Sequence, residues 1–407
     1  MTIQSQLPPQ ISAYLEATRF TQTTKFFLSE RVPAVGAAYY GTLTDIVRKI
    51  AAAHSIDVKV EIVYSDSMRS EAVMFGDQHF IIYDRYAGQV TNMMNRLFLY
   101  GSSRNTKLTY FHKLVSQILS RYGFYEEAAF AARQYQHYRD EMDHQRQQAD
   151  DGSGKHLLYT HIQETYVFLH EVTHILLKHV SELRQDLRKD VVSWIEEYAA
   201  RSGAYPEQPY VPQHCTEILA REDLIEEFCC DRFAITLLPT VISAQLNAVG
   251  KNDAESKSAT DEHIRAVLLC LLNLRTVQLL EAKCSAETQY DFNERVEGPT
   301  ILDTMYATFY SARAHHGKEC CYQFFDIEAS RYEPLHAGVT QLMSDHSDEI
   351  LDPALGTLST VMYDRSIRTT MAADFELIRT ALAKQNSEDS RLITSILHYV
   401  RPHEAGE

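Results

Sequence analysis

Two histidines and a glutamate in one short stretch are the residues best suited to carry chemistry in this chain. The segment His170-Glu171-Val172-Thr173-His174 lies in a run of helix-forming residues without Gly or Pro. Residues four apart on an α-helix share a face, so His170 and His174 can bind one metal ion. Glu171 is one position further round and can reach a water molecule on that metal. This spacing predicts a zinc-binding helix with a carboxylate base beside the metal.

The apolar flanks of this segment predict a buried helix. An unpaired buried polar group costs several kcal/mol, roughly 2–7, and a metal ion would satisfy both imidazoles and the carboxylate together. The alternative is a core helix without a metal, whose histidines hydrogen-bond to neighbouring side chains. The flanking apolar residues are Val167, Phe168, Val172, Ile175, Leu176 and Val180.

A catalytic zinc ion usually has three protein ligands and one open position. A third histidine six residues beyond His174 is excluded, because that position is Val180, and Leu177 stands where a glycine would accompany it. His179 is one residue off that spacing and lies about 140° round the helix from His174. We therefore expect His179 on another face of the helix, and the third ligand elsewhere in the chain.

A second helical pattern, over residues 221–238, offers the third ligand. Glu227 and Asp231 are four residues apart and share a face. Glu227 can bind the metal, while Asp231 can accept the outer N–H of a ligating histidine, expected to be His170, and fix its ring.

Two alternatives to this assignment remain. Glu226 is the fallback ligand, although its neighbour one turn later is Cys230, so it would lack a supporting carboxylate. The pattern also fits an ordinary acidic helix face, because Glu222 and Asp223 are close by.

Together these two segments resemble the gluzincin metallopeptidases, whose third zinc ligand is a glutamate. Residues 170–179 (His-Glu-Val-Thr-His-Ile-Leu-Leu-Lys-His) resemble the usual metal helix. Residues 227–234 (Glu-Phe-Cys-Cys-Asp-Arg-Phe-Ala) resemble the Glu-x-x-x-Asp-Arg block of the HtpX and CAAX prenyl protease family, and their continuation to Pro239 is similar to soluble ImmA/IrrE-type peptidases. The resemblance implies a zincin-like core and Zn²⁺ as cofactor.

The chain departs from that family in two respects. The HtpX and CAAX prenyl proteases are membrane proteins, whereas the richest apolar stretch here, Val267–Leu274, is short and is closed by Arg275. We therefore expect no membrane partner. Cys229 and Cys230 replace small residues between the glutamate and the aspartate, and we expect them to be small buried side chains, not metal ligands.

The hydropathy pattern predicts an α+β fold that is predominantly helical, with a small β-sheet preceding the metal helix. Residues 57–64 alternate with period two and predict a strand, and residues 71–84 predict a β-hairpin with Gly76-Asp77 at its turn. An exposed edge strand could hold an extended peptide. The alternative is a sheet that only supports the helix.

Changes in composition divide the chain into three predicted regions. Residues 1–55 form a helical segment, residues 56–249 the zincin-like core, and residues 259–407 a C-terminal helical region that follows a polar linker. Within the core, residues 125–148 are strongly charged and predict a long solvated helix. Residues 264–282 are apolar on most sides and predict a buried helix.

Composition narrows the partners and the compartment. A net charge of −16 argues against a nucleic-acid partner, which would need a basic face. The first residues lack the charged and apolar regions of a signal peptide. Seven cysteines, an odd number, are expected to stay reduced. We therefore expect a cytoplasmic protein of unassigned oligomeric state.

A cluster of polar side chains in residues 305–316 contains further candidates. Zinc peptidases often stabilise the oxyanion of the tetrahedral intermediate with Tyr, His or Arg, so Tyr310, Arg313 and His316 are candidates for that role. In a chain with 24 Tyr and 18 His, coincidence is the competing explanation. Tyr306 and His315 belong to the same cluster.

These patterns predict a zinc-dependent endopeptidase that cleaves a protein or peptide substrate. Zn²⁺ would be held by His170, His174 and Glu227, and Glu171 would assist the attack of zinc-bound water. The length beyond a minimal core suggests narrow specificity, and the ImmA/IrrE resemblance suggests a role in stress, toxin or phage defence. The alternative is a catalytically silent, zinc-stabilised regulatory or binding protein of zincin ancestry.

Overall fold

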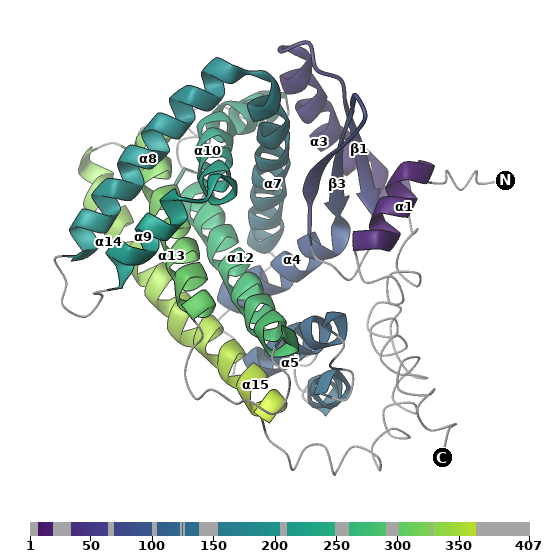
Figure 1. The fold of residues 1–407 in the computed structure, drawn as a ribbon, viewed down its shortest axis with the longest axis vertical. Helices are drawn as coiled ribbons and strands as arrows, with labels where there is room; N and C mark the ends of the chain where they lie inside the picture. The colour runs from purple at the N-terminus through teal and green to yellow at the C-terminus, as the bar shows by residue number, and fades with distance from the viewer. Residues whose placement is uncertain are drawn as a thin grey trace.

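A computed structural model describes most of the chain. The described residues are 7–18, 34–63, 69–99, 104–122, 124, 127–137, 154–203, 210–248, 260–289, 301–325, 327 and 329–363. Their structure is mostly helical with one small sheet (Figure 1), which confirms the predicted fold class at that level. The bounded helices are α1 (Pro9–Thr18), α3 (Ala34–Ala52), α4 (Arg85–Leu99), α5 (Arg104–Arg121), α7 (Lys155–His179), α8 (Ser181–Gly203), α9 (Val211–Leu219), α10 (Glu222–Ala248), α12 (Thr260–Gln289), α13 (Ile301–Phe324), α14 (Ala329–His346), the π-helix η1 (Ser347–Leu351) and α15 (Asp352–Tyr363).

The sheet contains the strand and the hairpin that the sequence predicted. Its strands are β1 (Val58–Val63), β2 (Glu71–Phe75) and β3 (Gln78–Asp84), in the order β1-β3-β2. β3 pairs in parallel with β1 and antiparallel with β2. Gly76 has a φ of +60° at the predicted turn, a conformation that glycine adopts without steric cost. β2 is therefore an edge strand, formed by a tight two-residue hairpin.

Two long helices form the centre of the molecule, and the sheet covers one side of it. α7 and α10 pack side by side, and α12 and α13 pack against them (Figure 1). Phe168, Val172 and Ile175 of α7 pack with Ile81 and Tyr83 of β3 in one core. The sheet is thus attached to the helix that carries the histidine motif.

The C-terminal helices share a core with α7, the helix that carries the histidine motif. Leu169 of α7 packs in one cluster with Leu238 of α10, Leu268 of α12, Cys320 of α13 and Val339 of α14. The division of the chain into three regions stays a prediction. The shared core means that the last region helps to hold α7 in place.

α12 fits its predicted role as a buried helix but not the expectation about membrane-spanning length. Over Thr260–Cys284 this described helix is long and apolar enough to cross a membrane by composition, with a mean hydropathy of 1.3. Inside the structure, 72% of that apolar window is buried. Such burial is typical of the core helix of a folded domain.

The predicted solvated helix at 125–148 is wrong where the structure describes it. Residues 127–137 are helical, but most of this helix is buried. Its alanines, at positions 128, 129, 131 and 132, are fully buried in a cluster with side chains of α5 and α15. The charged residues suggested solvent exposure, but the small side chains between them allow close helix packing. Residues 138–148 lie outside the described part.

Candidate metal centre

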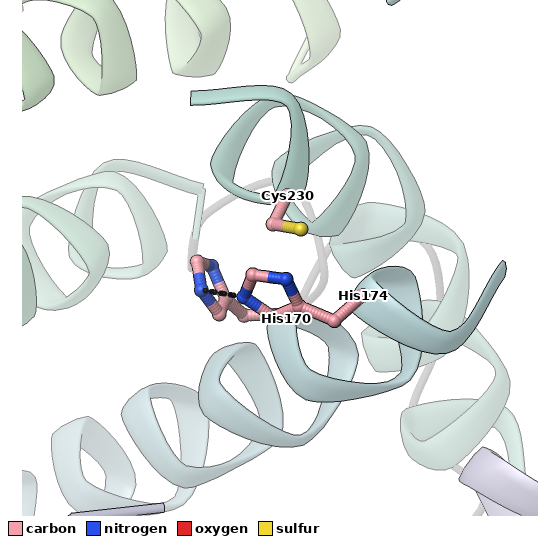
Figure 2. Close-up of side chains that lie close together, drawn as sticks. All are labelled: His170, His174 and Cys230. Carbon is pink, nitrogen blue, oxygen red and sulfur yellow. Dashed lines mark hydrogen bonds between the residues drawn. The ribbon is translucent and has the colours of Figure 1, made fainter. Parts of the chain in front are cut away.

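The two motif histidines face each other across one turn of α7, as their spacing predicts. Figure 2 shows their rings pointing toward one another, with Cys230 of α10 beside His174. Nε2 of His170 lies 3.2 Å from Nε2 of His174. Both residues are largely buried, with side chains 10% and 17% exposed. The helix therefore presents two nitrogen donors to one point in space.

Glu227 of α10 brings a carboxylate to the same point. Its Oε2 lies 3.4 Å from Nε2 of His170, and its Oε1 lies 3.5 Å from Nε2 of His174. Neighbouring donors around a tetrahedral zinc ion, at bond lengths of about 2.0–2.1 Å, are roughly 3.3 Å apart. The three donor separations match that value. The predicted set His170, His174 and Glu227 thus fits a zinc ion by chemistry and by spacing.

Cys230 is a competing donor that the sequence analysis set aside. Among the described residues, His170, His174 and Cys230 have potential ligand atoms that all lie within 4.8 Å of one another. Cys230 is fully buried, and burial raises the pKa of its thiol to about 12, so a metal bound there would first have to displace the thiol proton, whereas the pKa of Glu227 is held low. Glu227 lines the cavity described below, and Cys230 does not. Geometry and charge therefore favour the carboxylate.

Each motif histidine also has a carboxylate at its outer nitrogen. Nδ1 of His170 lies 2.9 Å from Oδ1 of Asp231, the contact that the sequence predicted. Nδ1 of His174 lies 2.8 Å from Oε1 of Glu226. A carboxylate at this position orients the ring and makes the inner nitrogen a better metal ligand. Glu226, considered only as a fallback ligand, is placed to support His174 instead.

Arg313 of α13 holds the carboxylates of α10 together. It donates to Asp231 through Nε at 2.7 Å and Nη2 at 2.8 Å, and its Nη1 lies 3.1 Å from Oε2 of Glu227. The hydroxyl of Tyr166 also donates to Asp231. Arg313 is bound to these carboxylates, so its contacts are those of a positioning group and differ from the predicted role at an oxyanion.

Electrostatics at this site favour a positive charge. Burial opposes protonation of His170, but hydrogen bonds and charge from Asp231 and Glu227 outweigh it and raise its pKa to about 9. Burial also opposes ionisation of Glu227, yet Arg313 and the two histidines hold its pKa well below the usual range. A pocket that stabilises protonated imidazoles and ionised carboxylates is electrostatically suited to a cation.

The site opens into a large cavity. The cavity has a volume of about 800 Å³ and is lined by residues of β2, α4, α7, α10, α12 and α13. Glu171 lines it and is 7% exposed, and burial raises the pKa of its carboxyl group. Glu171 therefore lines the same cavity as the two histidines; its predicted role as a base stays a prediction.

The other candidate residues occupy different surroundings. Tyr310 lines the cavity and its ring stacks on that of Tyr306. His316 does not line it: this residue is 1% exposed and its ring packs against those of Trp194 and Phe228. The expectation that His316 acts at an oxyanion is therefore not supported by its position, because aromatic side chains surround it.

His179 lies away from the centre, as expected. Its Nε2 is 2.9 Å from Nε2 of His79 at the start of β3. This contact joins the end of α7 to the sheet.

Two residues of this site have roles that differ from the sequence predictions. Glu226 was found but given another role, and Tyr166 was not considered. The one available signal was the spacing of Tyr166 and His170, which are four apart and share the face that meets Asp231.

No protein-family model, no curated protein and no solved structure matches this chain.

Proposed function

We propose that this chain is a zinc-dependent endopeptidase that cleaves a protein or peptide substrate within the cavity beside α7. The observation that carries the proposal is the convergence of Nε2 of His170, Nε2 of His174 and the Glu227 carboxylate at separations of 3.2–3.5 Å. These residues would hold the metal. When bound, it would supply a Lewis acid for the scissile carbonyl and make a water molecule more acidic.

Glu171 is the proposed general base. It lines the same cavity as the three donors and is next to His170 on α7. Burial raises the pKa of its carboxyl group toward neutral pH. A group that takes up and returns a proton works best when its pKa is close to the working pH. A structural or regulatory zinc site does not need a carboxylate at this position, so Glu171 favours a catalyst over a silent protein.

An edge strand supports a peptide as the substrate. Glu71 and Ala72 of β2 line the cavity, and among the described strands β2 is hydrogen-bonded to β3 on one side only. The free edge of such a strand can pair with an extended peptide through main-chain hydrogen bonds. A peptide bound in this way would pass along α7 beside the metal ligands.

Metal analysis and a cleavage assay test the proposal together. We expect about one zinc ion per wild-type chain, the same in Cys230→Ala, and far less in Glu227→Ala. In a mixed-peptide cleavage screen, Glu171→Gln should keep its zinc and lose activity by about 10²–10⁴-fold.

Each alternative has its own outcome in these assays. Zinc at full occupancy without cleavage of any peptide would support the catalytically silent protein. A chain without zinc would overturn the metal centre, and zinc loss in Cys230→Ala with retention in Glu227→Ala would reassign the third ligand.

A further inference from the structure

We propose that Glu164 forms a subsite that binds a basic side chain, Lys or Arg, of the substrate next to the cleaved bond. This inference rests on the proposed peptidase function and names its substrate class. Glu164 is not part of either motif, and nothing in the proposed chemistry at the metal uses it.

Glu164 and Glu171 lie on the same face of α7. Seven residues separate them, which is two helical turns, or roughly 10 Å along the axis. Both side chains line the same cavity of about 800 Å³. A substrate held at Glu171 therefore has Glu164 within the same space, two turns toward the start of the helix.

Three tyrosine hydroxyls hold the Glu164 carboxylate in place. Tyr39 donates to its Oε2 at 2.6 Å, while Tyr40 and Tyr83 donate to its Oε1 at 2.9 Å and 2.7 Å. The residue is 5% exposed. These donors come from α3 and β3, and they orient the carboxylate without supplying a positive charge.

Two other carboxylates of this cavity have a cation beside them. Glu227 lies 3.1 Å from Nη1 of Arg313, and Glu281 lies 3.0 Å from Nη2 of Arg69. Glu164 makes no ion pair with any residue in the described part of the chain. A buried carboxylate without a cation carries a desolvation cost that a charged ligand would offset. Glu164 is thus a carboxylate of this wall for which the described residues supply no cation.

Gly88 of α4 leaves the space that the Glu164 carboxylate occupies. A Cβ atom at this position would lie 2.3 Å from Oε1 of Glu164 and 3.0 Å from the Tyr83 hydroxyl. Gly88 itself lines the cavity. A side chain at position 88 would therefore displace the carboxylate or cover it.

The dimensions suit a basic side chain. A lysine or arginine side chain reaches roughly 6–7 Å beyond its Cα. Added to the path from the Cα to the carbonyl carbon, this reach covers most of the distance between Glu171 and Glu164 along α7. A residue whose carbonyl lies at Glu171 can thus place its cation at Glu164. The net charge of −16 would also attract basic segments.

A binding assay in the Glu171→Gln variant tests the subsite without requiring cleavage. The probes are two pools of fluorescein-labelled short peptides, identical except for Lys or norleucine at the central positions. We expect roughly tenfold tighter binding of the lysine pool, the scale of one charge-assisted contact. Adding Glu164→Gln should remove this preference while leaving norleucine binding unchanged. Equal binding of both pools, or a lysine preference that survives Glu164→Gln, would overturn the proposal.

Two further variants complete the test. Glu281→Gln removes a carboxylate that is already paired with Arg69, so the lysine preference should remain; its loss there would place the cation elsewhere and refute the subsite. Gly88→Ala should lower the preference by displacing the carboxylate, and it tests the subsite even if Glu164→Gln does not fold.

Failure of the subsite can be told apart from failure of the proposed function. A Glu164-dependent lysine preference in a protein that cleaves no peptide would leave the subsite standing and remove the peptidase assignment. Cleavage that depends on Glu171 but shows no preference for basic residues would do the opposite.

Discussion

Carboxylates lie at two places along α7, and their surroundings differ. One place is beside His170 and His174, here called the metal end, and the other is at Glu164, nearer the start of the helix. At the metal end, Asp231 and Glu227 are surrounded by imidazoles and by the guanidinium of Arg313. At the other end, Glu164 is held by hydroxyl groups alone. Both arrangements satisfy the hydrogen-bonding capacity of a carboxylate, but the first also balances its charge.

At the metal end, the negative charges of the carboxylates are balanced by positive groups of the protein itself. At Glu164 the charge has no such partner among the described residues and can attract a positively charged ligand. Positive groups around Asp231 and Glu227 set the position and the charge of one proposed metal ligand, Glu227, and of the carboxylate that orients another, His170. Neutral donors around Glu164 set its position and leave its charge to act on whatever enters the cavity. The comparison predicts different responses to mutation, to chelation and to pH.

Replacing Arg313 should give the largest effect. Arg313→Met leaves the fully buried Asp231 without its cation and also breaks the contact with Glu227, whose side chain is 32% exposed. Removal of one partner of a buried ion pair costs about 3–5 kcal/mol. We expect a loss of that size in the free energy of unfolding, measured by urea denaturation. Zinc affinity should also fall by about 10–100-fold, because the group that supports the ligands is lost.

The exposed Arg221 is the matched control for this substitution. It pairs with Asp223 at the surface, and Arg221→Met should cost less than about 1 kcal/mol. A similar small cost for Arg313→Met would show that the metal end is not organised by charge.

Removing the metal should lower the stability of every variant that keeps the proposed metal ligands, including Glu164→Gln. With free zinc at 100 times its dissociation constant, binding stabilises the folded chain by about 2.7 kcal/mol. A chelator should therefore lower the thermal midpoint of the wild type and of Glu164→Gln equally, as followed by circular dichroism. His174→Ala should show little response, and an unchanged shift in that variant would place the metal elsewhere.

Removing one hydroxyl tests the other end. Tyr83→Phe deletes a donor to a buried carboxylate, and hydrogen bonds to charged groups contribute about 2 kcal/mol. We expect a loss of that order in chemical denaturation with no change in zinc affinity. Tyr14→Phe removes a partly buried hydroxyl that donates to Glu71, and its cost should be smaller. A drop in zinc affinity in Tyr83→Phe would mean that the two ends are coupled.

Acid should produce the smallest effect, through a buried histidine beside the metal end. Burial lowers the pKa of His316 to about 4, below its ordinary value of 6.5. The unfolded chain therefore binds a proton at this residue before the folded chain does, so stability is complete above pH 6.5 and is lost as the pH falls toward 4. Between pH 7.5 and 5.5 this single group accounts for about 1 kcal/mol.

The variant His316→Phe isolates that contribution. Phenylalanine keeps an aromatic ring against Trp194 and Phe228 but cannot bind a proton. We expect a weaker pH dependence of the unfolding free energy by the amount above, and an unchanged slope would contradict the assignment.

Local sequence patterns were reliable where a single element carries the signal. Period two predicted β1, a Gly-Asp turn predicted the hairpin, and the i, i+4 spacing predicted that His170 and His174 face one another. The charged segment at 125–148 misled in its described part, because small alanines between the charges allow a buried helix. Pattern alone does not distinguish a solvated face from one that another helix covers.

The sequence by itself determined which residues can be donors, because the geometry of one helix follows from its local backbone. It also paired Glu227 with the histidine motif through an analogous spacing on a second helix. Only the tertiary structure decided the rest: that Glu226 supports His174, that Arg313 joins the two carboxylates of α10, and that three tyrosines converge on Glu164. These contacts depend on how helices rotate and pack against one another, and that packing is set by the whole core and not by any single segment.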